Sequence, residues 1–367
     1  MAERRASHVA TAWRGDLLVF GGEAPDDAPA DGTVHWYSSQ ARSWSGLPCV
    51  GHAPAGLTAA AGCSVADERL YVFGGFDATR GGYSGDLHVL DLRAEPSRWR
   101  RVCGEVETHP TPRRDASLCW WPANDGGALL LFGGWNLHEV HGDLRCFQLS
   151  RAEWDSPSKA ATHQPSLAAG GLQSQLPGHT RPTTADERVS EAAAAAARPL
   201  PRRGHSASVV AGRLVLFGGC LGLSAYVGDL WTWDGAAWAV ESPCGTPPSA
   251  RAWCSCSVLP TGAPNVGGAH HVAFVGGRDH SGCCIDPLWL LAISVPHPGG
   301  QPKTEWVAIK PPTPLPALRP RHSHTATVVG SQLLVLGGYA DDDDAPLAES
   351  SLATVEMAAL LATRSRP

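Results

Sequence analysis

Six Gly-Gly doublets, each at the end of a short apolar run, constrain the fold of this chain more than any other feature. The runs read LLVFGG, LYVFGG, LLLFGG, LVLFGG, VAFVGG and LLVLGG, and successive doublets lie tens of residues apart. Such a repeat predicts units that cannot bury an apolar face alone and therefore pack on one another. The doublets are Gly21-Gly22, Gly74-Gly75, Gly133-Gly134, Gly218-Gly219, Gly276-Gly277 and Gly337-Gly338.

The fourth unit shows the expected strands most clearly. Residues Ser206–Val210 form one β-like run, Leu214–Phe217 form a second that stops at the doublet, and Leu230–Trp233 form a third. Trp238 begins a fourth. Short β-branched and aromatic runs between glycine turns predict hairpins. Four antiparallel strands per unit, repeated around a ring, are typical of a β-propeller.

Polar and aromatic residues recur in register with the doublets. An Arg-x-x-His pattern precedes the first strand at Arg5/His8, Arg202/His205 and Arg321/His324. Each histidine lies 13 residues before the first glycine of its doublet. Counting 13 residues back from Gly74 gives Ala61 in the histidine position and Thr58 in the arginine position. Units three and five keep the arginine, as Arg113 and Arg251, and an aspartate precedes the third strand at Asp86, Asp143, Asp229 and Asp286. A tryptophan, which we interpret as scaffold like the glycines, closes five units: Trp44, Trp99, Trp154, Trp238 and Trp306.

This constellation resembles the kelch repeat, from about Arg4 to about Met357. The resemblance implies an all-β, six-bladed kelch β-propeller with four antiparallel strands per blade, in a protein that consists mainly of the propeller. The expected blades span about 4–50, 51–108, 109–155, 201–245, 246–312 and 313–365 of a single domain, 1–367. The last blade lacks a closing tryptophan and must use weak sequence such as Ala359–Thr363. Either the ring closes imperfectly or the chain is a fragment.

The segment 155–200 between blades three and four is rich in alanine and small polar residues. Its length and composition predict a disordered, low-complexity insertion.

The resemblance further implies a partner-binding face at the Gly-Gly end of the blades. Arginine forks suit carboxylates and phosphates, and exposed aromatic residues are good interface anchors. The alternative is that each arginine pairs with an aspartate or a carbonyl group and holds the blades together, and that the aromatics pack against the next blade. The predicted contact residues are Arg5, Arg113, Arg114, Arg202, Arg203, Arg251, Arg321, Phe76, Trp135 and Tyr339.

Two other clusters suggest ligands. Acidic loops in units one and six could form one negative sector; they contain Asp26, Asp27, Asp31 and Asp341–Asp344. Unit five gathers the thiols and imidazoles Cys254, Cys256, His270, His271, His280, Cys283 and Cys284. A zinc or redox site is conceivable there, but the spacing is not a standard zinc pattern. We therefore predict no metal and no cofactor, and interpret the cysteines as buried free thiols.

These patterns predict a non-enzymatic protein-interaction scaffold or adaptor, which could serve as a substrate-recognition subunit. Two alternatives stay open: a small-molecule enzyme or sugar-binding propeller that uses the central channel, and a structural subunit of a large assembly. The net charge of −6 argues against nucleic acid as a partner. The N-terminal sequence has no signal-like apolar stretch, and no run is long enough to span a membrane. We therefore expect a cytoplasmic protein.

Overall fold

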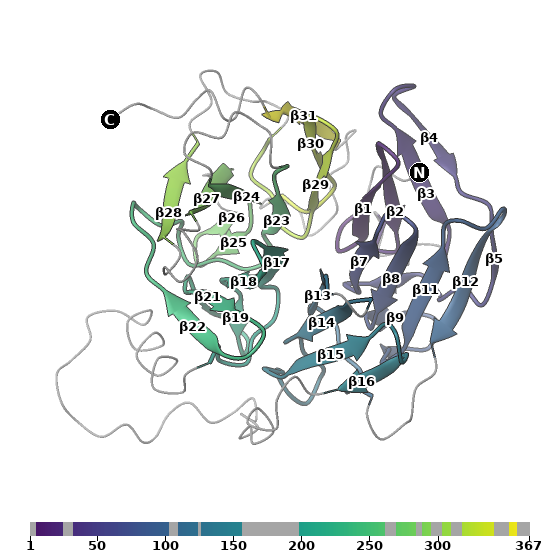
Figure 1. The fold of residues 1–367 in the computed structure, drawn as a ribbon, viewed down its shortest axis with the longest axis horizontal. Coiled ribbons are helices and arrows are strands. Elements are labelled where there is room, and N and C mark those ends of the chain that lie inside the picture. The colour runs from purple at the N-terminus through teal and green to yellow at the C-terminus, as the bar shows by residue number, and fades with distance from the viewer. Residues whose placement is uncertain are drawn as a thin grey trace.

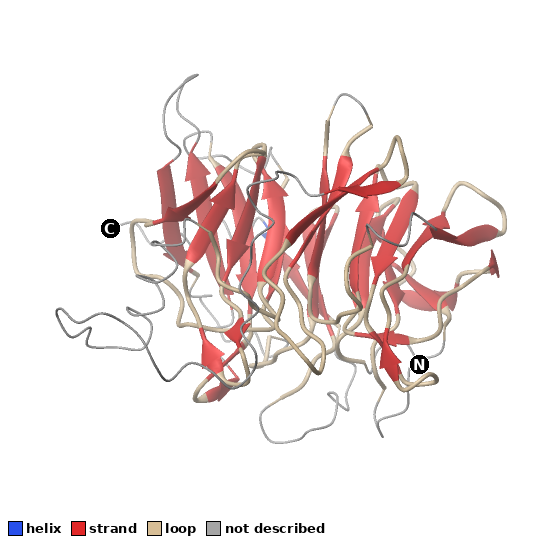
Figure 2. Cartoon of the chain, turned by 90° about the horizontal axis from the view of Figure 1, so that it is seen from below, coloured by secondary structure: helices blue, strands red, loops and turns tan. Residues whose placement is uncertain are grey.

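A computed structural model describes residues 5–24, 32–102, 109–123, 126–155, 198–260, 269–283, 288–294, 303–309, 318–340 and 352–357. The elements of regular structure among these residues are strands (Figure 2). The all-β prediction is therefore confirmed. None of the described segments is a helix long and apolar enough to cross a membrane.

The described strands form six larger sheets, one from each repeat unit, and we call each a blade. Neighbouring strands pair antiparallel, and the first strand of each blade lies innermost (Figure 1). Blade one contains β1 (Val9–Trp13), β2 (Asp16–Phe20), β3 (Val34–Ser38) and β4 (Ser43–Gly46). Blade two contains β7 (Ala61–Val65), β8 (Arg69–Phe73), β11 (Leu87–Asp91) and β12 (Ser97–Val102). Its outer edge carries a fifth, parallel strand, β5 (Cys49–Gly51).

The remaining blades repeat this order. Blade three contains β13 (Ser117–Trp121), β14 (Ala128–Phe132), β15 (Leu144–Gln148) and β16 (Glu153–Asp155). Blade four contains β17 (Ser206–Val210), β18 (Arg213–Phe217), β21 (Leu230–Trp233) and β22 (Trp238–Glu241). Blade five contains β23 (Ser255–Val258), β24 (His270–Val275), β27 (Leu288–Ser294) and β28 (Lys303–Ala308). Blade six has β29 (Thr325–Val329), β30 (Gln332–Leu336) and β31 (Ala353–Glu356) among the described residues.

Short strands after the doublets form small sheets at the Gly-Gly end of the blades. They are β6 (Leu57–Thr58), β9 (Phe76–Asp77) and β10 (Gly82–Tyr83) in unit two, β19 (Cys220–Leu221) and β20 (Ala225–Tyr226) in unit four, and β25 (Arg278–Asp279) and β26 (Gly282–Cys283) in unit five.

The innermost strands close a ring, because β1 contacts both β7 and β29. A second ring consists of backbone hydrogen bonds between residues just before these strands. The N–H of Ser7 donates to the carbonyl of Ser323 at 2.8 Å, and the N–H of Ala59 donates to that of Ser7 at 2.8 Å. The same bond joins each successive pair, and every non-glycine member has a φ between 52° and 56°. The six members are Ser7, Ala59, Asp115, Gly204, Trp253 and Ser323.

The doublets join each blade to the next. The N–H of Gly134 donates to the carbonyl of Arg202 at 2.9 Å, and the N–H of Gly338 donates to that of Arg5 at 3.0 Å, which links blade six to blade one. A Cβ atom on Gly133 (φ +64°) would lie 2.6 Å from the carbonyl oxygen of Arg202. Glycine is therefore required by both backbone conformation and close approach.

Aromatic pairs fill four of the spaces between blades. A phenylalanine before the doublet packs on the tryptophan of the next blade, with ring centroids 5.1 to 5.5 Å apart. Such contacts contribute beyond simple area burial. The pairs are Phe20–Trp99, Phe73–Trp154, Phe132–Trp238 and Phe217–Trp306.

The register expected for unit two was wrong by one residue. Ala61 pairs with Phe73 as Val9 pairs with Phe20, so the histidine position is Ala60. The arginine position is Leu57, whose carbonyl accepts from the doublet of blade one. The β7–β8 turn is longer and contains two residues of positive φ, Ala66 and Asp67. This extra residue shifts any count made from the doublet.

Several expectations lie outside the described residues. These are the fourth strand at Ala359–Thr363, most of the insertion 155–200, the two acidic loops, and Cys284.

Candidate functional site

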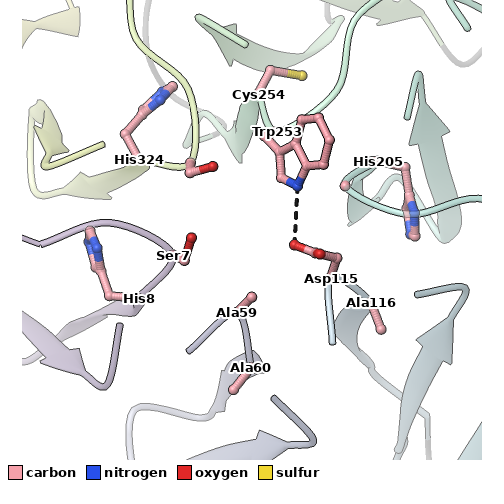
Figure 3. A pocket seen from close by; sticks show the side chains of 12 residues that line it. Ser7, His8, Ala59, Ala60, Asp115, Ala116, His205, Trp253, Cys254 and His324 are labelled. Atoms are coloured by element: carbon pink, nitrogen blue, oxygen red, sulfur yellow. Dashed lines mark hydrogen bonds between the residues drawn. The ribbon is translucent and has the colours of Figure 1, made fainter. Parts of the chain in front are cut away.

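A cavity of about 170 Å³ lies in the channel, at the ring of residues with positive φ (Figure 3). Ser7, Asp115, Trp253 and Ser323 line it together with histidines of the repeat. Trp253 and Asp115 point toward one another across this space. We call the Gly-Gly end of the channel the mouth.

The first arginine of each Arg-x-x-His pattern lies inside its own blade. In blade four, Arg202 is fully buried and its Nη1 donates to the carbonyl of Gly218 at 3.0 Å. The same guanidinium binds both carboxylate oxygens of Asp229, at 2.6 and 2.9 Å. Burial alone would raise the pKa of Asp229, but the charge and hydrogen bonds of Arg202 outweigh it and lower that pKa.

The equivalent arginines repeat this arrangement. Arg5, Arg113, Arg251 and Arg321 donate from Nη1 to the first glycine of their own doublets, at 2.9 to 3.1 Å. All four are buried. The geometry agrees with the part of the alternative in which each arginine pairs with an aspartate or a carbonyl group, but these side-chain bonds stay within one blade. Direct contact between them and a partner stays a prediction.

The second arginines, Arg114 and Arg203, lie at the mouth beside Trp135. Their guanidinium carbons are 5.1 and 4.3 Å from the centre of that ring. Arg203 also lies 5.5 Å from Trp253 and is 9% exposed. In the described part of the chain, no ion pair includes Arg203, and its Nε has no hydrogen-bond partner. Arginine stacked on two indoles is favourable, but its charge lacks a carboxylate.

Asp115 joins two of these aromatic residues. Its Oδ2 accepts from the indole of Trp135 at 3.0 Å, and its Oδ1 accepts from the indole of Trp253 at 3.1 Å. Arg114 lies 3.5 Å from the same carboxylate. Trp253 belongs to blade five and Asp115 to blade three, so their bond spans blade four. Gly204 permits this, because a Cβ there would lie 2.8 Å from the indole nitrogen of Trp253.

More aromatic side chains continue around the mouth. Phe76 packs on Tyr83 at 5.6 Å, and Tyr83 packs on Trp135 at 6.1 Å. His322 lies between Trp253 and Tyr339, at 6.3 and 5.3 Å. The predicted aromatics Phe76, Trp135 and Tyr339 are partly buried in these contacts.

Two exposed leucines lie in the loops that follow the doublets. Leu137 is 73% exposed and Leu223 is 75% exposed, and each follows the doublet of its unit. They belong to blades three and four, the blades that also supply Trp135 and Arg203. We call the set Asp115, Trp135, Leu137, Arg203, Leu223 and Trp253 the mouth site.

The repeat histidines bind between blades and stay neutral. Nε2 of His8 is hydrogen-bonded to Thr325 at 2.7 Å, and that of His205 to Ser117 at 2.8 Å. Burial, and then the neighbouring arginine, lowers the pKa of both histidines to about 3. Burial and nearby positive charge also hold the pKa of His324 well below its usual value. These rings are poor proton carriers near neutral pH.

The sulfur-rich blade five does not assemble a metal site within the described ranges, where no three ligand side chains converge. The thiol of Cys254 is instead 2.9 Å from the hydroxyl of Ser206. Burial raises the pKa of Cys254 and Cys256, which makes both thiols unreactive.

Sequence reasoning did not select Asp115, Trp253, Gly204, Leu137 or Leu223. The first three occupy one position, two residues after the arginine of the repeat. A comparison of that position across units would have shown serine, alanine, aspartate, glycine and tryptophan close to the repeated arginine and histidine positions. The exposed leucines had no signal other than their place just after the doublets.

Comparison with known proteins agrees with this architecture. A family model described as the KLHDC2/KLHL20/DRC7 Kelch-repeats domain matches residues 7–174 and 182–338. Kelch domain-containing protein 1 of Homo sapiens is 25% identical over 359 residues, which cover 93% of this chain and 77% of that protein. Host cell factor of Drosophila melanogaster is 25% identical over 290 residues, 69% of this chain and 18% of that protein. Dynein regulatory complex subunit 7 of Chlamydomonas reinhardtii is 33% identical over 131 residues, 35% of this chain and 11% of that protein. The chain belongs to the kelch-repeat family of β-propellers.

Proposed function

We propose that this propeller is a non-catalytic interaction scaffold that binds a protein partner at the mouth site. Trp135, Leu137 and Leu223 would supply the apolar contacts, and Arg203 the polar one. The main contacts would thus be the second arginines and the exposed leucines, and not the buried first arginines.

The observation that carries this proposal is the exposure of Leu137 and Leu223. Leu137 lies two residues after Trp135, and Leu223 lies in the turn between β19 and β20, where Cys220 of β19 pairs with Arg203. Burying a large apolar side chain that is about three-quarters exposed would contribute favourably to binding a partner. Trp135 cannot move freely, because Asp115 and two guanidinium groups hold it. A preorganised aromatic anchor loses little entropy on binding.

The charges at the mouth favour an acidic group on the partner. Two guanidinium groups flank Trp135, whereas Asp115 is the carboxylate beside them and both of its oxygens already accept indole N–H groups. An acidic side chain or a terminal carboxylate next to Arg203 would neutralise the second positive charge.

The adaptor role, including substrate recognition for another protein, remains our proposal. The name of one relative places it in a regulatory complex, which is consistent with assembly roles for this repeat. We also propose the cytoplasm as location, because Cys119, Cys220 and Cys254 are buried thiols without a disulfide bond.

The test is affinity capture with the wild-type chain and a Leu137→Asp/Leu223→Asp variant. Both substitutions fall on exposed side chains, so the fold should survive, which circular dichroism would check. Val240→Asp is the matched control, since Val240 is 41% exposed on β22, the outer strand of blade four.

A partner that binds the wild type and the control, but not the double variant, would support the mouth site. Binding of that partner should also weaken when Arg203 is changed to Gln. A partner retained by the double variant would contradict the proposal and move the contact to other surfaces. Loss with the Val240 control alone would place it on the outer strands.

A further inference from the structure

A cavity of about 620 Å³ lies at blade two, lined by residues 52–55 and by residues of β11 and β12. Residues 52–55 follow β5, which pairs with β12 at the outer edge of the blade (Figure 1). A space of this size is in the range of small-ligand pockets. Three arginines and two histidines line it: Arg80, Arg100, Arg101, His52 and His88.

The two carboxylates in the lining are occupied by local contacts. Oδ1 of Asp77 accepts the N–H and the hydroxyl of Thr79, at 2.9 and 2.5 Å, and the N–H of Arg80 at 3.2 Å. Oδ1 of Asp86 lies 2.6 Å from Nη2 of Arg101. The acceptors of the cavity are therefore engaged within the chain.

The guanidinium groups, by contrast, have donors to spare. Nε of Arg80 lies 3.4 Å from Asp77, and the Arg80 side chain is 79% exposed. In the described part of the chain, no carboxylate lies within ion-pair distance of Arg100. Each guanidinium carries five N–H donors. Three arginines against two aspartates leave the lining with one positive charge in excess.

His88 is a buried ring that the fold leaves without a partner. It is 7% exposed, and its Nδ1 has no hydrogen-bond partner among the described residues. Buried polar groups are normally satisfied. Burial lowers the pKa of His88; the charge of Asp86 opposes this effect, and the charges of Arg101 and Arg80 add to it. Both guanidinium groups are therefore close enough to act on the ring.

We propose that this cavity binds the phosphoryl group of a phosphate monoester. Such a group presents three acceptor oxygens and close to two negative charges near neutral pH. Arg80, Arg100 and Arg101 can share these oxygens, and a negative charge beside His88 favours uptake of a proton by its ring. A cation is disfavoured by the excess positive charge.

A lone carboxylate fits this lining less well. One arginine fork satisfies both oxygens of a carboxylate. The donors of the other two guanidinium groups would then remain unused, and so would His88. The number of donors around the cavity therefore favours the phosphoryl group.

Two sources carry this group: a phosphorylated serine of a protein partner and a free small phosphate ester. The cavity shares no residue with the mouth site. Failure of either proposal therefore leaves the other standing.

The experiment titrates glycerol 2-phosphate into the full chain by isothermal calorimetry at low salt. Arg100→Gln removes one guanidinium from the cavity. Arg98→Gln is the matched control, since Arg98 is an exposed arginine of the same strand and does not line the cavity. Both substitutions fall on exposed side chains, so both variants should fold, which thermal unfolding would check. Acetate is the probe for a lone carboxylate.

We expect glycerol 2-phosphate to bind the wild type and Arg98→Gln with similar affinity, and Arg100→Gln about tenfold more weakly, because a charge-assisted contact is lost. In a nuclear magnetic resonance titration the ester should shift the ring signals of His88. Those of His205, which is bound to Ser117 between blades three and four, should stay unchanged. This second readout locates the ligand without any substitution.

A short peptide with one phosphoserine separates the two sources. Tighter binding of the peptide than of glycerol 2-phosphate would support the site and assign the group to a protein partner. The reverse order would support the site and assign the group to a small molecule.

Absence of binding of both phosphate probes to the wild type at about 10 mM would overturn the proposal. Equal weakening by Arg98→Gln and Arg100→Gln would also overturn it, because a diffuse field of positive charge would then explain the binding. Acetate that binds as tightly as glycerol 2-phosphate would contradict the assignment to a phosphoryl group.

Discussion

The indole Nε1 of Trp253 in blade five donates a 3.1 Å hydrogen bond to Oδ1 of Asp115 in blade three, across the intervening blade four. Trp135 occupies the other oxygen of the same carboxylate at 3.0 Å. One aspartate thus fixes two aromatic rings from different blades, and Arg203 lies against both rings. The mouth of the channel is held by contacts that do not follow the repeat.

Replacing Trp253 by Phe removes the indole donor and retains most of the apolar ring. We expect a loss of about 1.5 to 3 kcal/mol in the free energy of unfolding, because the partly buried carboxylate loses a charge-assisted bond. Urea denaturation would measure it. Trp44→Phe is the control, since the buried indole nitrogen of Trp44 has no hydrogen-bond partner among the residues that the structure describes. Equal losses in the two variants would mean that the Trp253–Asp115 bond contributes nothing.

Replacing Arg202 by Ala should destabilise the fold before it affects any partner. The substitution leaves Asp229 buried without its cation, at an expected cost of about 3 to 5 kcal/mol. Arg98→Ala, on an exposed side chain of β12, should stay within about 0.5 kcal/mol of the wild type. Thermal unfolding of both variants would measure this difference in stability. An Arg202 variant of wild-type stability that loses a partner would return this arginine to the list of direct contacts.

The buried histidines make stability depend on pH in a defined direction. His8 and His205 have a pKa of about 3 in the fold, against 6.5 when exposed. Above pH 6.5 both states are neutral and these groups contribute no pH dependence. Between pH 6.5 and about 4 the unfolded chain takes up protons that the fold excludes. The free energy of unfolding should therefore fall by up to about 1.4 kcal/mol per pH unit for each histidine.

Urea denaturation at pH 7.5, 6 and 5 would test this slope. Asp143 and Asp229 have lowered pKa values, below 3.8, and so do not titrate in this range. His205→Asn should flatten the slope, whereas His138→Asn, on an exposed loop, should leave it unchanged. A slope unaltered by His205→Asn would show that this ring becomes protonated in the fold.

The sequence was sufficient for the fold because the repeated residues make the same contact in most of the blades. Gly133, Phe132 and Trp238 each have counterparts that contact the neighbouring blade in the same way. The repeat in the sequence therefore predicts how the blades pack. The function of the repeat arginines was harder to predict, since nothing in the sequence shows that their guanidinium groups reach the carbonyls of their own doublets.

The mouth site could not be predicted because it depends on differences between repeats. Asp115 and Trp253 occupy the same repeat position, and they meet only because Gly204 occupies it in the blade between them. A search for recurring residues discards such departures. Leu57 is a further case: a longer turn in β7–β8 shifted the count, and the absent arginine was assigned to Thr58.

Gly204 provides the sharpest test of the contact across blade four. An Ala at this position would place its Cβ 2.8 to 3.0 Å from the indole of Trp253, and would also strain a residue at φ +61°. Gly212→Ala is a matched control, because Gly212 has φ +69° and nothing within 4 Å of a built Cβ. The positive φ destabilises both alanine variants, by on the order of 1 kcal/mol. The Gly204 variant should be less stable than the control and should expose Trp253, which a red shift of its fluorescence would report. Identical stability and emission in the two variants would mean that the indole has room to move aside, and that Gly204 does not set its position.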